Sequence, residues 1–223
     1  MRCVIAVCAV LVGAVLAGCP AADDSDDMPD APDGKTLGLE LTWTMKSPVP
    51  GPITSEETIA SVHFETQDLR VVGDAGPGDT RTQVSELDLE WTSSVSPSKV
   101  MFPDAPAGLY SQVLLRLEGE AGENEAGYEI RGTTMIEGSE VPFTIRDTTS
   151  LALAMELSLQ LDPAEKGTID VEIDLHDAID GVTYSSLPIV DGRRVLGPAD
   201  AQMPAFRSKL MQAFSAQEAT STQ

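Results

Sequence analysis

The sequence predicts a mainly β fold: an antiparallel two-sheet β-sandwich of about eight strands with a short C-terminal helix. Apolar and polar residues alternate with a period of two in most segments between residues 35 and 175, as expected for strands that bury one face. Short stretches rich in Gly, Pro, Asp and Ser separate these segments, and no helical repeat lies between them. The 223 residues, with 18 Gly and 15 Pro, suit one turn-rich domain with appendages.

The first 18 residues have the composition of a secretory signal peptide. Met1-Arg2 gives a positive start, and residues 3–16 form an uncharged apolar run, shorter than the roughly 20 residues needed to cross a bilayer. Leu16-Ala17-Gly18-Cys19 closes this run. The tetrad resembles the lipobox of bacterial lipoproteins, which implies cleavage between Gly18 and Cys19 and attachment of diacylglycerol and a further acyl chain to Cys19. A plain signal peptide followed by a free thiol is the alternative.

Lipidation at Cys19 would anchor the chain to the cell envelope, because several acyl chains bind a bilayer far more firmly than one. Cys3 and Cys8 would leave with the signal peptide, so the lipid would occupy the one cysteine that remains. Disulfides, a Cys-ligated zinc and a Cys–His dyad are therefore excluded. The resemblance also favours the outer membrane, because Pro20 rather than Asp follows the lipidated residue.

Residues 19–34 are expected to be a lipidated Cys and a disordered acidic tether. After Cys19 the segment contains six Asp, three Pro and scarcely any large apolar residue, so it cannot bury enough surface to offset the entropy of ordering. A calcium loop is the alternative for residues 24–28. The EF-hand pattern, however, requires a Gly that this segment lacks.

The sandwich is assigned to residues 35–192. Alternation is clearest in 151–161, where an amphipathic helix would instead place apolar residues three and four apart. In the second strand, Val62 and Phe64 are predicted to face inward. In the fourth, Leu109 is predicted to share a face with Val113. The expected strands are 37–45, 58–72, 84–91, 109–117, 128–136, 140–147, 151–161 and 169–176.

Two turns are expected to join neighbouring strands. Gly138-Ser139 fits a two-residue type II′ turn, which needs Gly first. Pairing outward from this turn sets Arg131 opposite Arg146, which we interpret as part of a charge ladder, with an anion-binding site as the alternative. Residues 162–167 are expected to join the last two strands as a hairpin loop.

A motif marks the start of the strand 109–117. Pro106-Ala107-Gly108-Leu109-Tyr110 runs from an irregular crossing loop directly into the strand. It resembles a strand start found in several bacterial extracytoplasmic sandwich domains of uncharacterised function, some of them carried by lipoproteins. The resemblance covers residues 102–118 and supports the fold without indicating an activity. Gly108 permits the turn, and the Tyr110 hydroxyl is expected to bond to nearby backbone.

Residues 193–223 are expected to form a C-terminal helix and a frayed tail. A helix that docks on the end of the sandwich is the favoured interpretation, and an exposed helix that binds a partner is the alternative. The tail is assigned to residues 219–223. The apolar residues at helical spacing are Met203, Phe206, Leu210, Met211 and Phe214.

The charge balance excludes nucleic acid as a partner. The chain has 36 acidic and 14 basic residues, a formal net charge of −22, whereas binding to phosphates needs clustered Lys and Arg. The candidate metal ligands are Asp170, Glu172 and Asp174 on one strand face, followed by Asp177. Alternate strand residues lie about 6.5–7 Å apart, so one ion would need further ligands from neighbouring strands. A solvated acidic face explains the same residues.

Catalytic signatures are absent from the sequence. It has no Gly-x-Ser-x-Gly elbow, His-Glu-x-x-His motif, phosphate loop or dinucleotide fingerprint. Its two histidines, His63 and His176, fall on outward-facing positions of predicted strands. An imidazole at His176 oriented by Asp174 or Asp177 would serve as a general base, which defines an unrecognised hydrolase as the third hypothesis.

The favoured hypothesis is a non-enzymatic lipoprotein of the cell envelope, an interaction or structural module without a cofactor. Its expected partners are the membrane, through the lipid on Cys19, and an envelope protein. The alternative is a calcium- or ligand-binding module that uses the acidic strand faces at Asp170, Glu172, Asp174 and Asp177.

Overall fold

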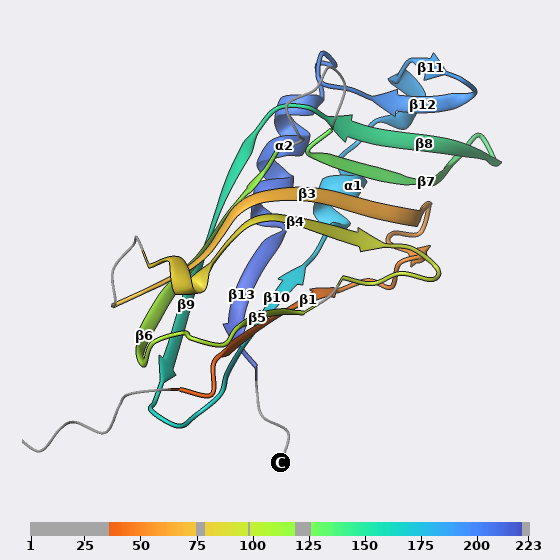
Figure 1. Cartoon of the computed structure of the whole chain (residues 1–223). Helices are drawn as coiled ribbons and strands as arrows, with labels where there is room; N and C mark the ends of the chain where they lie inside the picture. The colour runs from red at the N-terminus through yellow and green to blue at the C-terminus, as the bar shows by residue number, and fades with distance from the viewer. Residues whose placement is uncertain (1–35, 75–78, 98, 119–125, 220–223) are drawn as a thin grey trace, which may run out of the picture. The chain divides into compact units, whose positions relative to one another are not determined.

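The computed structural model describes residues 36–74, 79–97, 99–118 and 126–219. The predicted signal peptide, the lipidation site Cys19 and the acidic tether lie outside the described residues. Within them the chain forms two β-sheets, two short α-helices and two 3₁₀ turns (Figure 1). The prediction of a mainly β, two-sheet fold with a short helix is confirmed.

The smaller sheet has the strand order β13-β10-β1-β5. β1 (Leu39–Met45) lies in its interior, parallel to β10 (Gly167–Ile173) and antiparallel to β5 (Val100–Phe102). β13 (Phe214–Glu218) pairs antiparallel with β10. The parallel pairing of β1 and β10 makes this sheet mixed and not wholly antiparallel. A parallel pair needs a long connection, and here most of the chain between β1 and β10 forms the strands of the other sheet.

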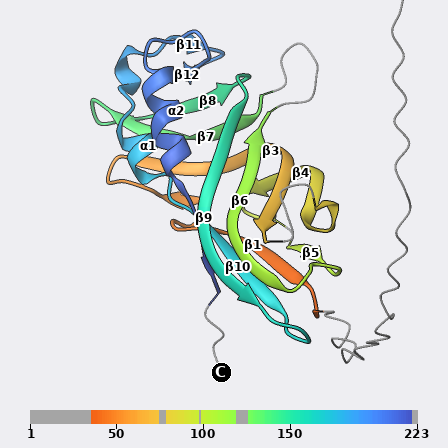
Figure 2. The ribbon, with the colours of Figure 1, turned by 90° about the vertical axis from the view of Figure 1, so that its left-hand side faces the viewer.

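The larger sheet is built around β3, a 17-residue strand. The first half of β3 pairs with β7 and the second half with β6, so these two strands follow one another along the same edge. β2 and β4 pair with β3. β9 lies beside β6, as Figure 2 shows. The strands are β2 (Gly51–Pro52), β3 (Glu57–Gly73), β4 (Gln83–Trp91), β6 (Gly108–Leu117), β7 (Tyr128–Ile136), β8 (Ser139–Asp147), β9 (Leu151–Leu161), β11 (Ile189–Val190) and β12 (Arg193–Leu196).

The apolar faces of both sheets pack into one core. Val62 and Phe64 are fully buried, as predicted from the alternation in β3. The predicted face of β6 is wrong at its start, because Tyr110 is 2% exposed and Leu109 is 38% exposed. The pairing of β6 with β9 shifts register between Tyr110 and Gln112, and this irregularity moves the first residues of β6 to the opposite face.

The turn between β7 and β8 differs from the predicted one. Its two residues are Glu137 and Gly138, with φ of 51° and 77°, and two successive left-handed residues make a type I′ turn. Ser139 therefore belongs to β8, and the predicted type II′ turn and the facing of Arg131 with Arg146 are wrong. Arg146 instead lies opposite Glu129, a favourable pairing of opposite charges.

The segment between β9 and β10 is not a hairpin loop. β9 belongs to the larger sheet and β10 to the smaller one, so residues 162–166 carry the chain from one sheet to the other. The prediction failed because each strand has a better partner elsewhere. β9 pairs with β6, and β10 is enclosed between β1 and β13.

The C-terminal segment is part of the domain. α2 (Met203–Gln212) docks on the body through its buried residues Met203, Phe206 and Leu210, which confirms the docked helix. Phe214 does not extend the helix. It starts β13, and its ring lies 5.4 Å from that of Phe64. β12 belongs to the larger sheet and β13 to the smaller one, so residues 193–218 are part of the sandwich and not a separate segment. Residues 220–223 of the predicted tail lie outside the described part.

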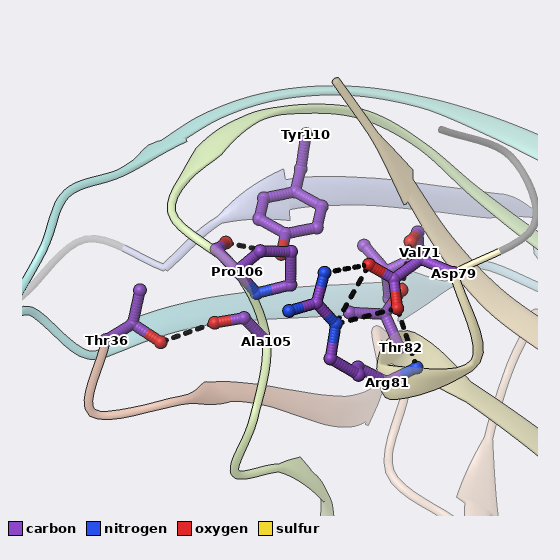
Figure 3. A network of polar contacts seen from close by, with 8 residues as sticks. All are labelled: Thr36, Val71, Asp79, Arg81, Thr82, Ala105, Pro106 and Tyr110. Atoms are coloured by element: carbon purple, nitrogen blue, oxygen red, sulfur yellow. Dashed lines mark hydrogen bonds and ion pairs between the residues drawn. The ribbon is translucent and has the colours of Figure 1, made fainter. Parts of the chain in front are cut away.

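The first described residue is tied to the crossing loop before β6 (Figure 3). The Thr36 hydroxyl donates to the Ala105 carbonyl at 2.6 Å. The Tyr110 hydroxyl donates to the Pro106 carbonyl at 2.7 Å, which confirms its predicted bond to backbone, and Gly108 has a φ of 147°. Burial raises the pKa of Tyr110 to about 12, so the hydroxyl keeps its proton and remains a donor at neutral pH.

Candidate functional site

On β10, the acidic residues predicted as metal ligands lie beside uncharged polar side chains of the flanking strands. Asp170 accepts a hydrogen bond from the Thr42 hydroxyl on β1, and Glu172 lies between Thr44 and Ser215 on the flanking strands. The neighbouring strands therefore contribute three hydroxyl groups and the amide of Gln217 at these positions instead of the additional carboxylates that a calcium site would need.

Asp174 and Asp177 do reach a common cleft of about 230 Å³, together with Asp180. Two lysines lie at this cleft: Lys46 Nζ is 2.7 Å from the Asp174 carboxylate, and Lys209 Nζ donates to the main-chain carbonyl of Asp177 at 2.9 Å, whereas the Asp177 carboxylate itself is largely exposed. The hydrogen bond from Lys46 holds the pKa of Asp174 below its usual range. In the described part of the chain, no three His, Cys, Asp or Glu residues are arranged to hold a metal ion.

Neither histidine lines this cleft. His176 is not on a strand, as the sequence predicted, but begins the short helix α1 (His176–Asp180). Its Nδ1 lies 3.2 Å from the adjacent Asp177 carboxylate, and its side chain is half exposed and does not line the cleft. His63 lies on the outer face of β3 between its register partners Glu90 and Glu129. His176 and Asp177 thus lie as close together as the hydrolase hypothesis requires, but on an exposed surface, and His176 is not among the residues that line the cleft.

A different cavity combines charge with an apolar floor. It lies on the outer face of β3, β6 and β9, has a volume of about 360 Å³, and is called the arginine groove below. The register explains its floor: Leu114 faces Ala154, and Arg116 faces Ala152. Because alanine has no side chain beyond Cβ, this part of β9 leaves a depression beside longer neighbours. The lining residues are Asp68, Arg70, Leu114, Leu115, Arg116, Ala152, Leu153 and Ala154.

An irregularity in β3 brings the charged residues together. The pairing of β3 with β6 shifts register between Gln67 and Arg70, and Asp68 has a φ of 53°. Such bulges redirect side chains and recur next to functional sites. Here Asp68 receives Arg116 Nη2 at 2.7 Å and lies 3.7 Å from Arg70 Nη2. The bulge thus places one carboxylate between two guanidinium groups.

The two arginines differ in how completely they are paired. Arg116 is held between Asp68 and Glu118, whose carboxylate lies 3.1 Å from Arg116 Nε. Among the described residues Arg70 makes only the long contact with Asp68, and the buried Nε atoms of both Arg70 and Arg116 lack a hydrogen-bond partner. Because Arg70 has one long ion pair and Arg116 has two shorter ones, Arg70 is the guanidinium in the groove that would gain most from an added acceptor.

Sequence reasoning placed paired arginines in the β7–β8 hairpin, whereas the structure brings together Arg70 and Arg116. The period of two in β6 and β9 does predict that Arg116, Ala152 and Ala154 face outward. It does not show that β9 lies beside β6, and the bulge at Asp68 has no clear sequence signal. The groove therefore depends on strand order and register, which one sequence does not reveal.

No protein-family model, curated protein or solved structure compared with this chain matches it.

Proposed function

We propose that the protein is a lipid-anchored lipoprotein of the cell envelope whose β domain is a non-catalytic interaction module. The observation that carries this proposal is the tetrad Leu16-Ala17-Gly18-Cys19 at the end of a short apolar run. Among the described residues, no helix is long and apolar enough to cross a membrane. The lipid on Cys19 would supply the attachment, and the outer membrane is the proposed location.

The position of the domain along the chain fits such an anchor. Seventeen peptide steps separate Cys19 from Thr36. At full extension they would reach about 60 Å, at roughly 3.3–3.6 Å per residue. The hydrogen bond from Thr36 to Ala105 holds the first described residue against the body of the domain, so the chain from the proposed anchor would enter the domain at a fixed position.

The electrostatics of the domain favour a structural role for its charged groups. Glu40, Asp79, Asp147 and Asp174 have a pKa below the usual range, and each accepts hydrogen bonds from Lys or Arg. Glu40, for example, receives both Lys99 and Lys166 at 2.5 Å and so joins three segments of the chain. Structural ion pairs perturb pKa values just as catalytic sites do. The lowered pKa of each of these four carboxyl groups comes from hydrogen bonds that include one from a Lys or Arg partner.

Replacement of the lipidated residue tests the proposal. The Cys19→Ala variant is expected to lose metabolic labelling by palmitate and to leave the detergent-soluble membrane fraction. Cys8→Ala is the matched control, because it removes another cysteine of the same leader and should leave labelling unchanged. Continued labelling and membrane attachment of Cys19→Ala would contradict the proposal, as would a native product that begins at Met1.

A further inference from the structure

We propose that the arginine groove binds a small organic oxyanion, with a carboxylate or phosphate head on Arg70 and Arg116 and a short apolar body on β9. This inference gives the proposed interaction module a ligand but does not depend on lipidation at Cys19. It rests on three observations: two converging guanidinium groups, an apolar floor and a volume of about 360 Å³.

The head group is indicated by the arginines. A guanidinium presents a planar fork of donors that matches the oxygens of a carboxylate or phosphate. The Asp68 carboxylate, which lies between Arg70 and Arg116, shows that the two side chains can approach one such group. The partly exposed Arg70 guanidinium reaches Asp68 only at 3.7 Å through Nη2. An incoming oxyanion would give it a closer acceptor, and two guanidinium groups favour a ligand with at least two oxygens on one centre.

The body of the ligand is indicated by the floor. Ala152 and Ala154 are exposed and lie beside Arg116 and Leu114 across the β6–β9 pairing. They leave room directly next to the guanidinium groups, where a hydrocarbon chain would cover apolar surface. The volume lies near the lower end of the about 300–1,000 Å³ found for small-molecule sites, which favours a short ligand over a long lipid chain.

Asp68 would compete with such a ligand, because its carboxylate holds Arg116 at 2.7 Å in the free protein. Asp68→Asn removes that charge, and Asn tolerates the left-handed backbone that this position requires. The substitution should therefore strengthen oxyanion binding. A gain of affinity on removal of a carboxylate would be hard to explain by general damage to the fold.

The probes are hexanoate and hexyl phosphate, which carry the same apolar body on two different heads. Binding to the full chain in non-ionic detergent is followed by the thermal midpoint and by calorimetry, because a ligand that binds the folded state raises the midpoint with concentration. Hexan-1-ol tests the body alone, and inorganic phosphate tests the head alone. At least one hexyl anion should give a saturable shift that exceeds the effects of both controls. The stronger of the two anions would identify the head group.

Variants locate the site. Arg70→Gln and Arg116→Gln should each weaken binding by about tenfold or more, the effect of a lost charge-assisted hydrogen bond. Ala154→Leu should fill the depression and abolish binding while the fold remains intact. Arg131→Gln is the matched control, because Arg131 is an exposed, ion-paired arginine outside the groove. It should bind as the unchanged chain does.

Three results would overturn the inference: no saturable shift with either anion, an equal shift with hexan-1-ol, or an equal loss of affinity in Arg131→Gln. A midpoint measured without ligand identifies any variant that is unfolded, and Asp68→Asn then decides the question through its expected gain. Failure of the anchor would appear separately, as lipid labelling that persists in Cys19→Ala.

Discussion

The pair Asp147–Arg207 and the cluster of Asp68 with Arg70 and Arg116 use the same kinds of side chain, aspartate and arginine, in opposite ways. Asp147 has no exposed surface and receives Arg207 Nε and Nη2 at 2.5 and 2.9 Å. Asp68 is 43% exposed and is shared by two arginines, one of them at 3.7 Å. Burial and complete pairing make the first a structural connection, whereas exposure and incomplete pairing leave the second open to a ligand.

The Asp147 site connects three parts of the chain. Asp147 ends β8, Arg207 lies on α2, and the Tyr128 hydroxyl at the start of β7 donates to the same carboxylate at 3.2 Å. The Thr149 amide adds a further hydrogen bond at 3.1 Å. Every side of this carboxylate is thus occupied, and its removal from water is compensated only while all these donors remain.

The largest expected effect comes from breaking the buried pair. Arg207→Met should lower the free energy of unfolding by about 3–5 kcal/mol, because it leaves a buried carboxylate without its cation. Urea denaturation measures the loss. In the control Arg131→Met, which breaks an exposed pair with Glu129, the loss should be below about 1 kcal/mol. Equal losses of unfolding free energy in the two variants would show that burial does not make the Arg207 ion pair more stabilising than the exposed Arg131 pair.

The pH dependence of stability should follow the same connection. Burial raises the pKa of Asp147, but the hydrogen bonds from Arg207 and Thr149 outweigh it, and the resulting pKa lies below the usual range. A carboxylate with a lowered folded-state pKa stabilises the protein above its unfolded pKa of about 3.9, and this contribution is lost as pH falls through the folded-state value.

Urea titrations between neutral pH and pH 3 check this expectation. The unchanged chain should lose stability at the acidic end. In Arg207→Met the unpaired Asp147 destabilises the fold less when it is protonated. The difference in the free energy of unfolding between the two proteins should therefore become smaller at the acidic end. A constant difference across the range would contradict the role assigned to Asp147.

Backbone strain gives a third, smaller comparison. Asp68 and Glu137 both have left-handed φ values, 53° and 51°, but Asp68 is held by two arginines whereas Glu137 is an exposed turn residue. Glu137→Asn should raise the free energy of unfolding by about 1 kcal/mol, because Asn suits a type I′ turn. Thermal denaturation checks the gain, and a loss would show that the Glu137 side chain itself stabilises the turn.

The smallest effect on stability is expected in the groove. Arg116→Gln breaks half-exposed ion pairs with Asp68 and Glu118 and should change the free energy of unfolding by about 0.5 kcal/mol. Urea denaturation beside Arg207→Met makes the contrast direct. A loss as large as that of Arg207→Met would mean that the groove arginines mainly hold the sheet together.

The sequence predicts those features that depend on one strand at a time. The alternation in 151–161 and the burial of Val62 and Phe64 are visible because the period of two is local. The left-handed residues Asp68 and Glu137 are not visible, because neither is the Gly that usually marks such a backbone.

Features formed by distant residues needed the structure. Asp147 and Arg207 are 60 residues apart and meet only because α2 packs against the body. The groove likewise requires β3, β6 and β9 to lie side by side with the register that sets Arg116 against Ala152. In the same way, the residues 162–166 fit either a hairpin loop or a connection between two sheets, and only the strand pairing distinguishes the two.

The interior position of β1 has a mechanical consequence. A membrane anchor ahead of Thr36 would transmit tension along this strand, whose seven residues pair with β10 on one side and whose first three pair with β5 on the other. The ladder bonds run across the strand, so a pull along its axis loads them in shear and all at once, instead of opening them one by one. Under the proposed lipidation at Cys19, tension on the anchor would therefore load the whole β1–β10 ladder together.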